Sequence, residues 1–158
     1  MLLFITILIT FLLMEGVAWI MHKYVMHGYF WFLHEDHHVH DIHDSFFERN
    51  DTFFIFFAIL AITSFSLWAF VSSVLFLGIG IGITIYGAIY FLIHDLFIHQ
   101  RVRILRNTKN SYLRAIRKAH KVHHKHMTKE DGECFGMLWV PIKYYKAAFK
   151  AWNHSTFS

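Results

Sequence analysis

Two long uncharged runs constrain the fold more than any other feature of this chain. Residues 53–93 contain no charged residue, and residues 2–21 contain only one, Glu15. A helix needs about 20 apolar residues to cross a bilayer. The first run therefore predicts one span, and the second predicts two spans joined by a tight turn near Ser72–Ser73. We expect an all-α integral membrane protein with three transmembrane helices at about residues 2–21, 53–71 and 74–93.

Two other interpretations of these runs are weaker. A soluble helical bundle is disfavoured, because uncharged runs of this length rarely stay soluble. The first run lacks the basic segment and the small-residue cleavage site of a signal peptide, so it predicts a retained anchor. At 158 residues the chain predicts a single domain, residues 1–158. The lone cysteine, Cys134, excludes an internal disulfide and a thiolate-rich metal site.

The basic residues predict the orientation in the membrane. Only Lys23 and Arg49 precede residue 94, and the other thirteen follow it. Basic segments stay in the cytoplasm, so residues 94–158 should be cytoplasmic and, with three spans, residues 22–52 should share that side. The sequence predicts a multi-pass protein of the inner (cytoplasmic) membrane. Its net charge of +4 fits a membrane surface better than nucleic acid.

Further elements are expected around these spans. Both cytoplasmic segments should contain helices. Residues 135–152 mix lysines with aromatic residues and predict an interfacial C-terminal helix. Four glycines within residues 78–87 predict close packing of the third span on a neighbour.

The histidines form one pair of patterns that occurs twice. HKYVMH at 22–27 is followed by HEDHH at 34–38, and HDLFIH at 94–99 is followed by HKVHH at 120–124. Each pair reads HxxxxH and then HxxHH, and the predicted topology puts both pairs on one membrane face. The ten histidines are His22, His27, His34, His37, His38, His94, His99, His120, His123 and His124.

The spacing of these histidines favours metal binding. In HxxHH the three rings share one helix face and can converge on a point. In HxxxxH the rings are about 140° apart on an α-helix, which indicates a wide site, two different metals or a helix that ends between them. Imidazole suits zinc, copper, iron and nickel, and the lack of thiolates argues against structural zinc. Two ions with about six positions each offer about twelve, so ten ligands favour a two-metal centre with open positions.

Carboxylates near the histidine boxes are candidates for holding the ligand rings, since a ligand histidine usually donates its other N–H to an acceptor. We expect some second-shell contacts from the set, although a single carboxylate of this kind is more often solvated or salt-bridged. Glu15, inside the first span, either reaches a ring or bonds a neighbouring helix. The four favoured candidates are Glu15, Asp36, Asp51 and Asp95, within a wider set that includes Glu35, Asp41, Asp44 and Glu48.

From about Glu15 to Pro141 the chain resembles a known family. HKYVMH, HEDHH, FERNDTFF, HDLFIHQR, AHKVHH and CFGMLWVP occur in the order seen in bacterial β-carotene hydroxylases, which are membrane non-haem di-iron enzymes of the fatty acid hydroxylase superfamily. The resemblance implies two irons held by the ten histidines, with no catalytic residue apart from these ligands. It also implies O2 as oxidant, a ferredoxin-type electron donor, and hydroxylation of the β-ionone ring of a carotenoid at C3. The chain departs from the pattern at four histidines, which we expect to lie on the surface or in the second shell: His40, His43, His126 and His154.

Other functions remain open at this stage. A metal transporter or storage protein also gathers histidines, but a transporter needs polar groups near the bilayer midplane, and residues 53–93 have no ionisable group. A sterol or fatty-acyl hydroxylase, a desaturase, or an enzyme for a ketolated carotenoid fits the boxes as well. The nine basic residues of segment 101–125 either follow the positive-inside rule and attract anionic lipid or dock an acidic electron donor. The oligomeric state is not predicted.

Overall fold

The computed structural model describes residues 1–39, 47–102 and 107–156, with side chains up to Lys150. All regular elements within these ranges are helices, in agreement with the expected fold class. The α-helices are α1 Leu2–Ile20, α2 Trp31–His38, α3 Thr52–Val71, α4 Val74–Phe91, α5 Ser111–His123 and α6 Ile142–Thr156. Two π-helices, Met21–Tyr29 and Leu92–Ile98, continue α1 and α4, and the 3₁₀ turn Arg49–Asp51 precedes α3.

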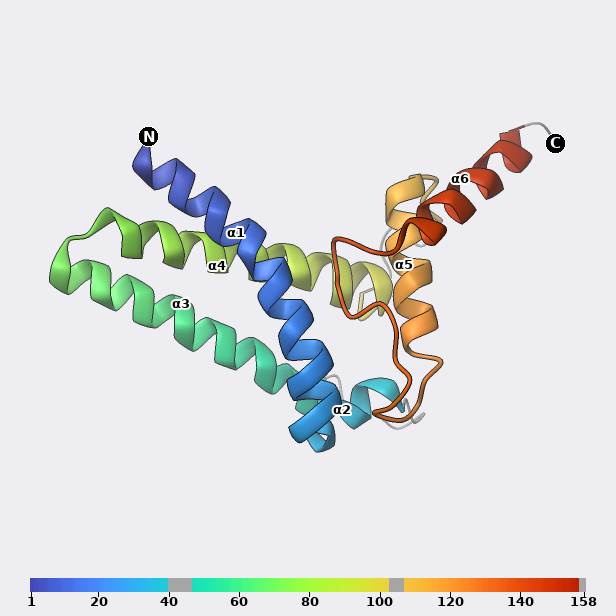
Figure 1. Ribbon diagram of the computed structural model, residues 1–158, viewed down its shortest axis with the longest axis horizontal. Coiled ribbons are helices and arrows are strands. Elements are labelled where there is room, and N and C mark those ends of the chain that lie inside the picture. The colour runs from blue at the N-terminus through green and yellow to red at the C-terminus, as the bar shows by residue number, and fades with distance from the viewer. Residues whose placement is uncertain (40–46, 103–106, 157–158) are drawn as a thin grey trace.

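Three helical segments are long and apolar enough to cross a membrane: Leu2–Tyr29, Arg49–Val71 and Val74–Ile98. α3 and α4 form a hairpin, and α1 crosses α4 (Figure 1). The hairpin turns at Ser72, which adopts the left-handed conformation with φ 54°, so the predicted turn is confirmed. Phe4, Ile62 and Phe70 are 70%, 63% and 87% exposed. A soluble bundle would bury such side chains, so these surfaces are suited to lipid and the chain is a membrane protein.

Small residues let α4 approach α1 closely. A Cβ added at Gly78 would lie 2.7 Å from the Cβ of Thr6, and one added at Gly82 would lie 2.6 Å from the Cβ of Thr10. Any side chain at either glycine would force the helices apart, which confirms the packing expected there. Gly87 differs, because a Cβ added there would lie more than 4 Å from every described atom outside the adjoining backbone of its own helix.

The first and third spans do not end where hydropathy predicts. Both helices continue beyond residues 21 and 93, with the wider π-type winding. The Phe30 N–H donates to the Val25 carbonyl at 2.8 Å, and the His99 N–H donates to the His94 carbonyl at 2.9 Å, both five residues back. Hydropathy detects the hydrocarbon-crossing part of a helix and is blind to a polar continuation. These continuations carry both HxxxxH boxes.

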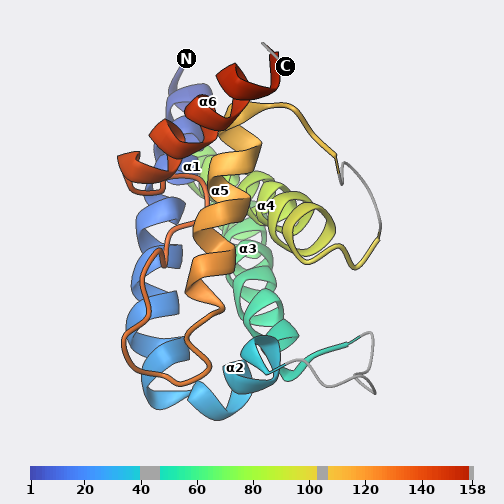
Figure 2. The ribbon, with the colours of Figure 1, turned by 90° about the vertical axis from the view of Figure 1, so that its right-hand side faces the viewer.

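The remaining helices gather at the end of the bundle opposite the Ser72–Ser73 turn (Figures 1 and 2). α5 packs against α6 through Ala115 and Ala119 on one side and Tyr144 and Ala148 on the other. The predicted C-terminal helix begins later than expected, because α6 starts at Ile142 and the segment before it forms a loop that covers the histidines.

Candidate metal centre

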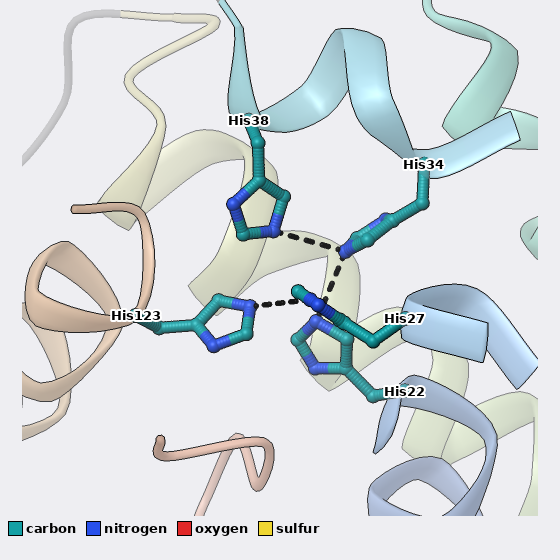
Figure 3. A group of neighbouring side chains, drawn as sticks. All are labelled: His22, His27, His34, His38 and His123. Atoms are coloured by element: carbon teal, nitrogen blue, oxygen red, sulfur yellow. Dashed lines mark hydrogen bonds between the residues drawn. The ribbon is translucent and has the colours of Figure 1, made fainter. Parts of the chain in front are cut away.

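The ten boxed histidines come together in two adjacent clusters, although they are spread over about a hundred residues of sequence. The ligand atoms within each of the two groups lie within 4.8 Å of one another. The first cluster is His22, His27, His34, His38 and His123 (Figure 3). The second is His37, His94, His99 and His120, joined by His124, whose Nε2 lies 2.9 Å from Nε2 of His120.

Each HxxHH box divides its rings between the two clusters. In the box on α2, His34 and His38 belong to the first cluster and His37 belongs to the second. In the box at the end of α5, His123 belongs to the first cluster, whereas His120 and His124 belong to the second. The expectation that the three rings of one box converge on a single point is therefore wrong. Residues i and i+4 overlie each other on a helix, whereas residue i+3 lies about 100° from i+4 and faces the neighbouring cluster.

The π-helices explain the HxxxxH spacing. His22 and His27 share the first cluster with ring centroids 5.2 Å apart, and His94 and His99 share the second at 4.5 Å. In a π-helix residue i bonds residue i+5, so the two histidines stack on one face instead of diverging by about 140°. The three explanations that an α-helix would require, namely a wide site, two different metals or a helix end between the histidines, therefore do not apply to either HxxxxH pair.

The inward-facing nitrogens carry the strongest sign of a metal. Nε2 atoms are 3.1 Å apart in the pairs His22–His34 and His27–His123, and 3.0 Å apart in His37–His94. Two neutral rings that each present a lone pair repel at this distance unless a cation lies between them. For a metal–nitrogen bond of about 2.1 Å, nitrogens bound at right angles lie about 3.0 Å apart. The donor set therefore fits two metal ions bound by imidazole.

The outward-facing nitrogens fix the tautomer that metal binding requires. In seven of the ten rings, Nδ1 lies at hydrogen-bond distance from an oxygen, which assigns the proton to Nδ1 and leaves Nε2 free. Four acceptors in the first cluster are backbone carbonyls of the loop after α5. These are Phe135 for His22, Lys129 for His27, His126 for His38 and Glu133 for His123, at 2.8–3.3 Å.

Side chains supply the other three acceptors. Nδ1 of His34 lies 2.7 Å from Oδ1 of Asn50, and Nδ1 of His37 lies 2.7 Å from Oε2 of Glu48. Nδ1 of His94 lies 3.1 Å from Oδ2 of Asp95. A loop thus supplies most of the acceptors of the first cluster, and carboxylates orient two rings of the second, His37 and His94.

Burial keeps the rings neutral. Loss of solvation, with repulsion between neighbouring rings, lowers the pKa of His34 to about 2, of His38 to about 4 and of His123 to about 3. The same causes lower the pKa of His37 and His120 well below the usual value. Neutral imidazole is the form that binds metal, so the site is prepared for a cation and resists protonation.

Of the four favoured carboxylates, Asp95 contacts a ring directly. Asp36 accepts instead from the backbone N–H and the guanidinium of Arg49. Asp51 pairs with Arg101 at 2.8 Å, and Arg101 also lies 3.2 Å from Glu48 and 3.1 Å from Asp95. Asp51 also accepts from the backbone N–H of Glu48 at 3.1 Å, so it reaches the centre indirectly, through Arg101 and Glu48.

Glu15 takes the second of its two predicted roles. Its Oε2 accepts from the Tyr86 hydroxyl on α4 at 2.7 Å, and its Oε1 accepts from the backbone N–H groups of residues 137–139 at 2.8–3.1 Å. The turn needs Gly136, where an added Cβ would lie 2.7 Å from a backbone oxygen. Glu15 thus anchors to α1 the loop whose carbonyls orient the first cluster.

Sequence reasoning missed several of these contacts. Asn50 was not singled out, although it stands in the FERND segment, and Glu48 was only one of a wider set of acids. The loop carbonyls leave no signal in the sequence, because every residue type carries one. Only the three-dimensional path of the loop identifies them.

The four additional histidines are expected to be dispensable for metal binding. His126 contributes its backbone carbonyl, which an alanine retains. His40 and His43, like Asp41 and Asp44, lie outside the described residues, as does the side chain of His154. Changing each of the four to alanine should leave the metal content of purified protein near normal. Complete loss of metal in His40→Ala would mean that the ligands of the α2 segment are wrongly assigned.

Comparison with known proteins fits this geometry. The model of the family described as fatty acid hydroxylase matches residues 7–155, nearly the whole chain. The chain belongs to the fatty acid hydroxylase family. No solved structure matches it significantly.

The relatives of this hydroxylase include enzymes named for a carotenoid. It is 35% identical to the β-carotene hydroxylase of Paracoccus sp. (strain PC1) over 87% of this chain and 84% of the relative. It is also 35% identical to the β-carotene hydroxylase of Pantoea ananas, over 85% of this chain and 75% of the relative. A chloroplastic β-carotene hydroxylase 2 of Capsicum annuum is 33% identical over 76% of this chain and 39% of its own. Family and clusters together identify a membrane hydroxylase with a histidine-rich site of the di-iron type.

Proposed function

We propose that this hydroxylase uses O2 to hydroxylate the β-ionone ring of β-carotene at C3, giving β-cryptoxanthin and then zeaxanthin. The observation that supports this most directly is the pair of histidine clusters in a chain that is about one-third identical to several β-carotene hydroxylases. We assign all ten boxed histidines as iron ligands. Iron bound there would supply the oxygen activation that side chains alone cannot, since the substrate carbon carries no acidic proton.

The protein itself supplies positioning and a dry environment. His34, His94 and His123 are at most 1% exposed, so their lone pairs are shielded from water. The outward hydrogen bonds hold seven of the ten rings before a metal arrives, which reduces the cost of assembling the site. No other side chain needs to act as an acid or base in this scheme.

The membrane setting suits such a substrate. A carotenoid is insoluble in water, and the centre lies at one end of three spans where a molecule dissolved in the bilayer can reach it. We place the centre on the cytoplasmic side of the inner membrane, because the basic residues concentrate in the segment that follows the third span.

We further propose that a ferredoxin-type protein delivers electrons at α5. This helix turns His120 and His123 inward, while Lys118 and Lys121 on it, and Lys125 just after it, are exposed. An acidic donor would be steered to such a surface. Electrons would then have to travel across only one helix.

Pigment analysis tests the proposed reaction. The chain is expressed in a host that accumulates β-carotene, and zeaxanthin should appear while a His123→Ala variant leaves β-carotene unchanged. A parallel host that makes a ketolated carotenoid tests the alternative ring. Hydroxylation of the ketolated carotenoid alone, or of neither pigment, would refute β-carotene as the substrate.

A singly hydroxylated intermediate should accumulate. An extended carotenoid is about as long as the hydrocarbon core is thick, roughly 30 Å, and the ten ligands lie at one end of the bundle. Only one end ring can therefore reach the irons in one binding event. In a time course with limiting enzyme, β-cryptoxanthin should rise and then fall. Zeaxanthin formed from the first turnovers, without released intermediate, would contradict a one-sided centre.

A further inference from the structure

A narrow apolar pocket lies between the spans and leads toward the metal centre. Its walls come from α1, α3 and α4, including Met14, Phe53, Phe57, Ile83, Tyr86 and Gly87. Asn50 and Tyr90 line it as well, and both contact the centre. Asn50 bonds His34 of the first cluster, and the Tyr90 ring lies 5.0 Å from the ring of His94 in the second. The pocket therefore borders both clusters.

The chemistry of the pocket suits a hydrocarbon. No charged side chain is among the described residues that form its wall. Two of its polar groups are already satisfied, because Asn50 Oδ1 accepts from His34 and the Tyr86 hydroxyl donates to Glu15. A carboxylate or a lipid headgroup would find no partner for its charge there. From Ile83 to Tyr90 the wall extends along α4 for about 10 Å, enough for one end of a long molecule.

Gly87 differs from the packing glycines of the same helix. Gly78 and Gly82 let α4 contact α1, whereas a Cβ at Gly87 would meet nothing within 4 Å. Gly87 is nevertheless on the pocket wall. Helix packing therefore does not explain the glycine at this position, whereas its place on the pocket wall offers a reason for a small residue there.

We propose that Gly87 sets the width of a pocket that receives the terminal ring of the carotenoid and delivers it to the two clusters. This inference rests on the proposed function. A methylated six-membered ring is wider than a linear chain, so the position should discriminate between carotenoid ends that carry a ring and those that do not. Gly87 is a specificity-determining residue in this account.

Binding measured without turnover tests the proposal. Iron-loaded protein in lipid nanodiscs is titrated under anaerobic conditions with β-carotene and with an acyclic carotene of equal length. Gly87→Leu should weaken β-carotene binding by about tenfold or more, as a few misplaced methylenes do in a shaped pocket, and change binding of the acyclic carotene much less. Gly87→Ala should give a smaller effect of the same sign. Iron content should equal that of the wild type.

A matched control is available on α1. Gly16 also has nothing within 4 Å of an added Cβ, but it is exposed and outside the pocket, so Gly16→Leu should bind both carotenes like the wild type. If Gly87→Leu loses iron, its carotene binding cannot be interpreted, and the binding of the two carotenes by Gly87→Ala then tests the proposal. Unchanged binding of β-carotene in the Gly87 variants, or equal loss of both carotenes, would overturn the pocket assignment while leaving an active wild type and the proposed function intact. A wild type that neither binds nor hydroxylates β-carotene would overturn both.

Discussion

Replacing His37 or His123 by alanine should abolish hydroxylation, although the two residues belong to different clusters. Each ring is buried and points its Nε2 at a neighbour, His94 for His37 and His27 for His123, so neither ligand has a substitute from solvent. Loss of an outer contact to a ligand typically costs up to about a hundredfold, and loss of the ligand itself should exceed that. Product formation by each purified variant measures the effect.

The metal content of these variants separates the clusters. His123→Ala should lose mainly the ion of the first cluster and His37→Ala that of the second, so each variant should retain close to half of the iron. His126→Ala is the matched control and should keep both activity and iron. Full activity in either ligand variant would refute its assignment.

Replacing Arg101 by leucine should destabilise the protein and weaken the second cluster. The guanidinium is 11% exposed and lies within 3.2 Å of carboxylates of Glu48, Asp51 and Asp95. Without it, three neighbouring acids lose their counter-ion, and breaking a buried pair costs about 3 kcal/mol or more. Two of these acids orient His37 and His94, so iron affinity should fall by about tenfold to a hundredfold. Thermal denaturation in detergent and iron titration measure the two effects.

Arg49→Leu provides the control for charge removal. Arg49, which follows Glu48 in the chain, pairs with Asp36, but the Arg49 side chain is 54% exposed. An exposed pair contributes about 0–1 kcal/mol, so the variant should denature near the wild-type temperature and bind iron normally. Equal effects of the two substitutions would show that Arg101 has no special relation to the second cluster.

The membrane architecture was predictable because its signal is local and cumulative. The absence of charge over residues 53–93 predicts two spans, and Ser72–Ser73 marks the turn that the structure confirms. The gathering of the histidines was predictable from topology, since two spans separate the two repeats and two crossings return the chain to the same side of the membrane. What hydropathy could not detect is the π-helical continuation of two spans, because it depends on backbone hydrogen bonding and not on side-chain polarity.

The division of ligands between the two clusters was beyond sequence reasoning for a related reason. Spacing shows which rings share a helix face, but it does not show which partner each face meets. His37 and His38 are neighbours in sequence, yet they serve different clusters, because adjacent residues on a helix point about 100° apart. Glu15 illustrates the same limit: a charge within a span predicts a functional contact, but only the folded loop reveals that the contact is with three backbone N–H groups.

The iron content of active protein tests the central claim most directly. Two clusters with inward-facing imidazole nitrogens predict about two irons per chain, and full activity should require both. Protein purified from iron-replete cells is analysed for metal and activity in the same preparation, and chelation followed by stepwise return of iron gives the stoichiometry. We expect activity to rise until about two irons are bound per chain. Full activity with one iron per chain, or with none, would contradict the two-metal centre.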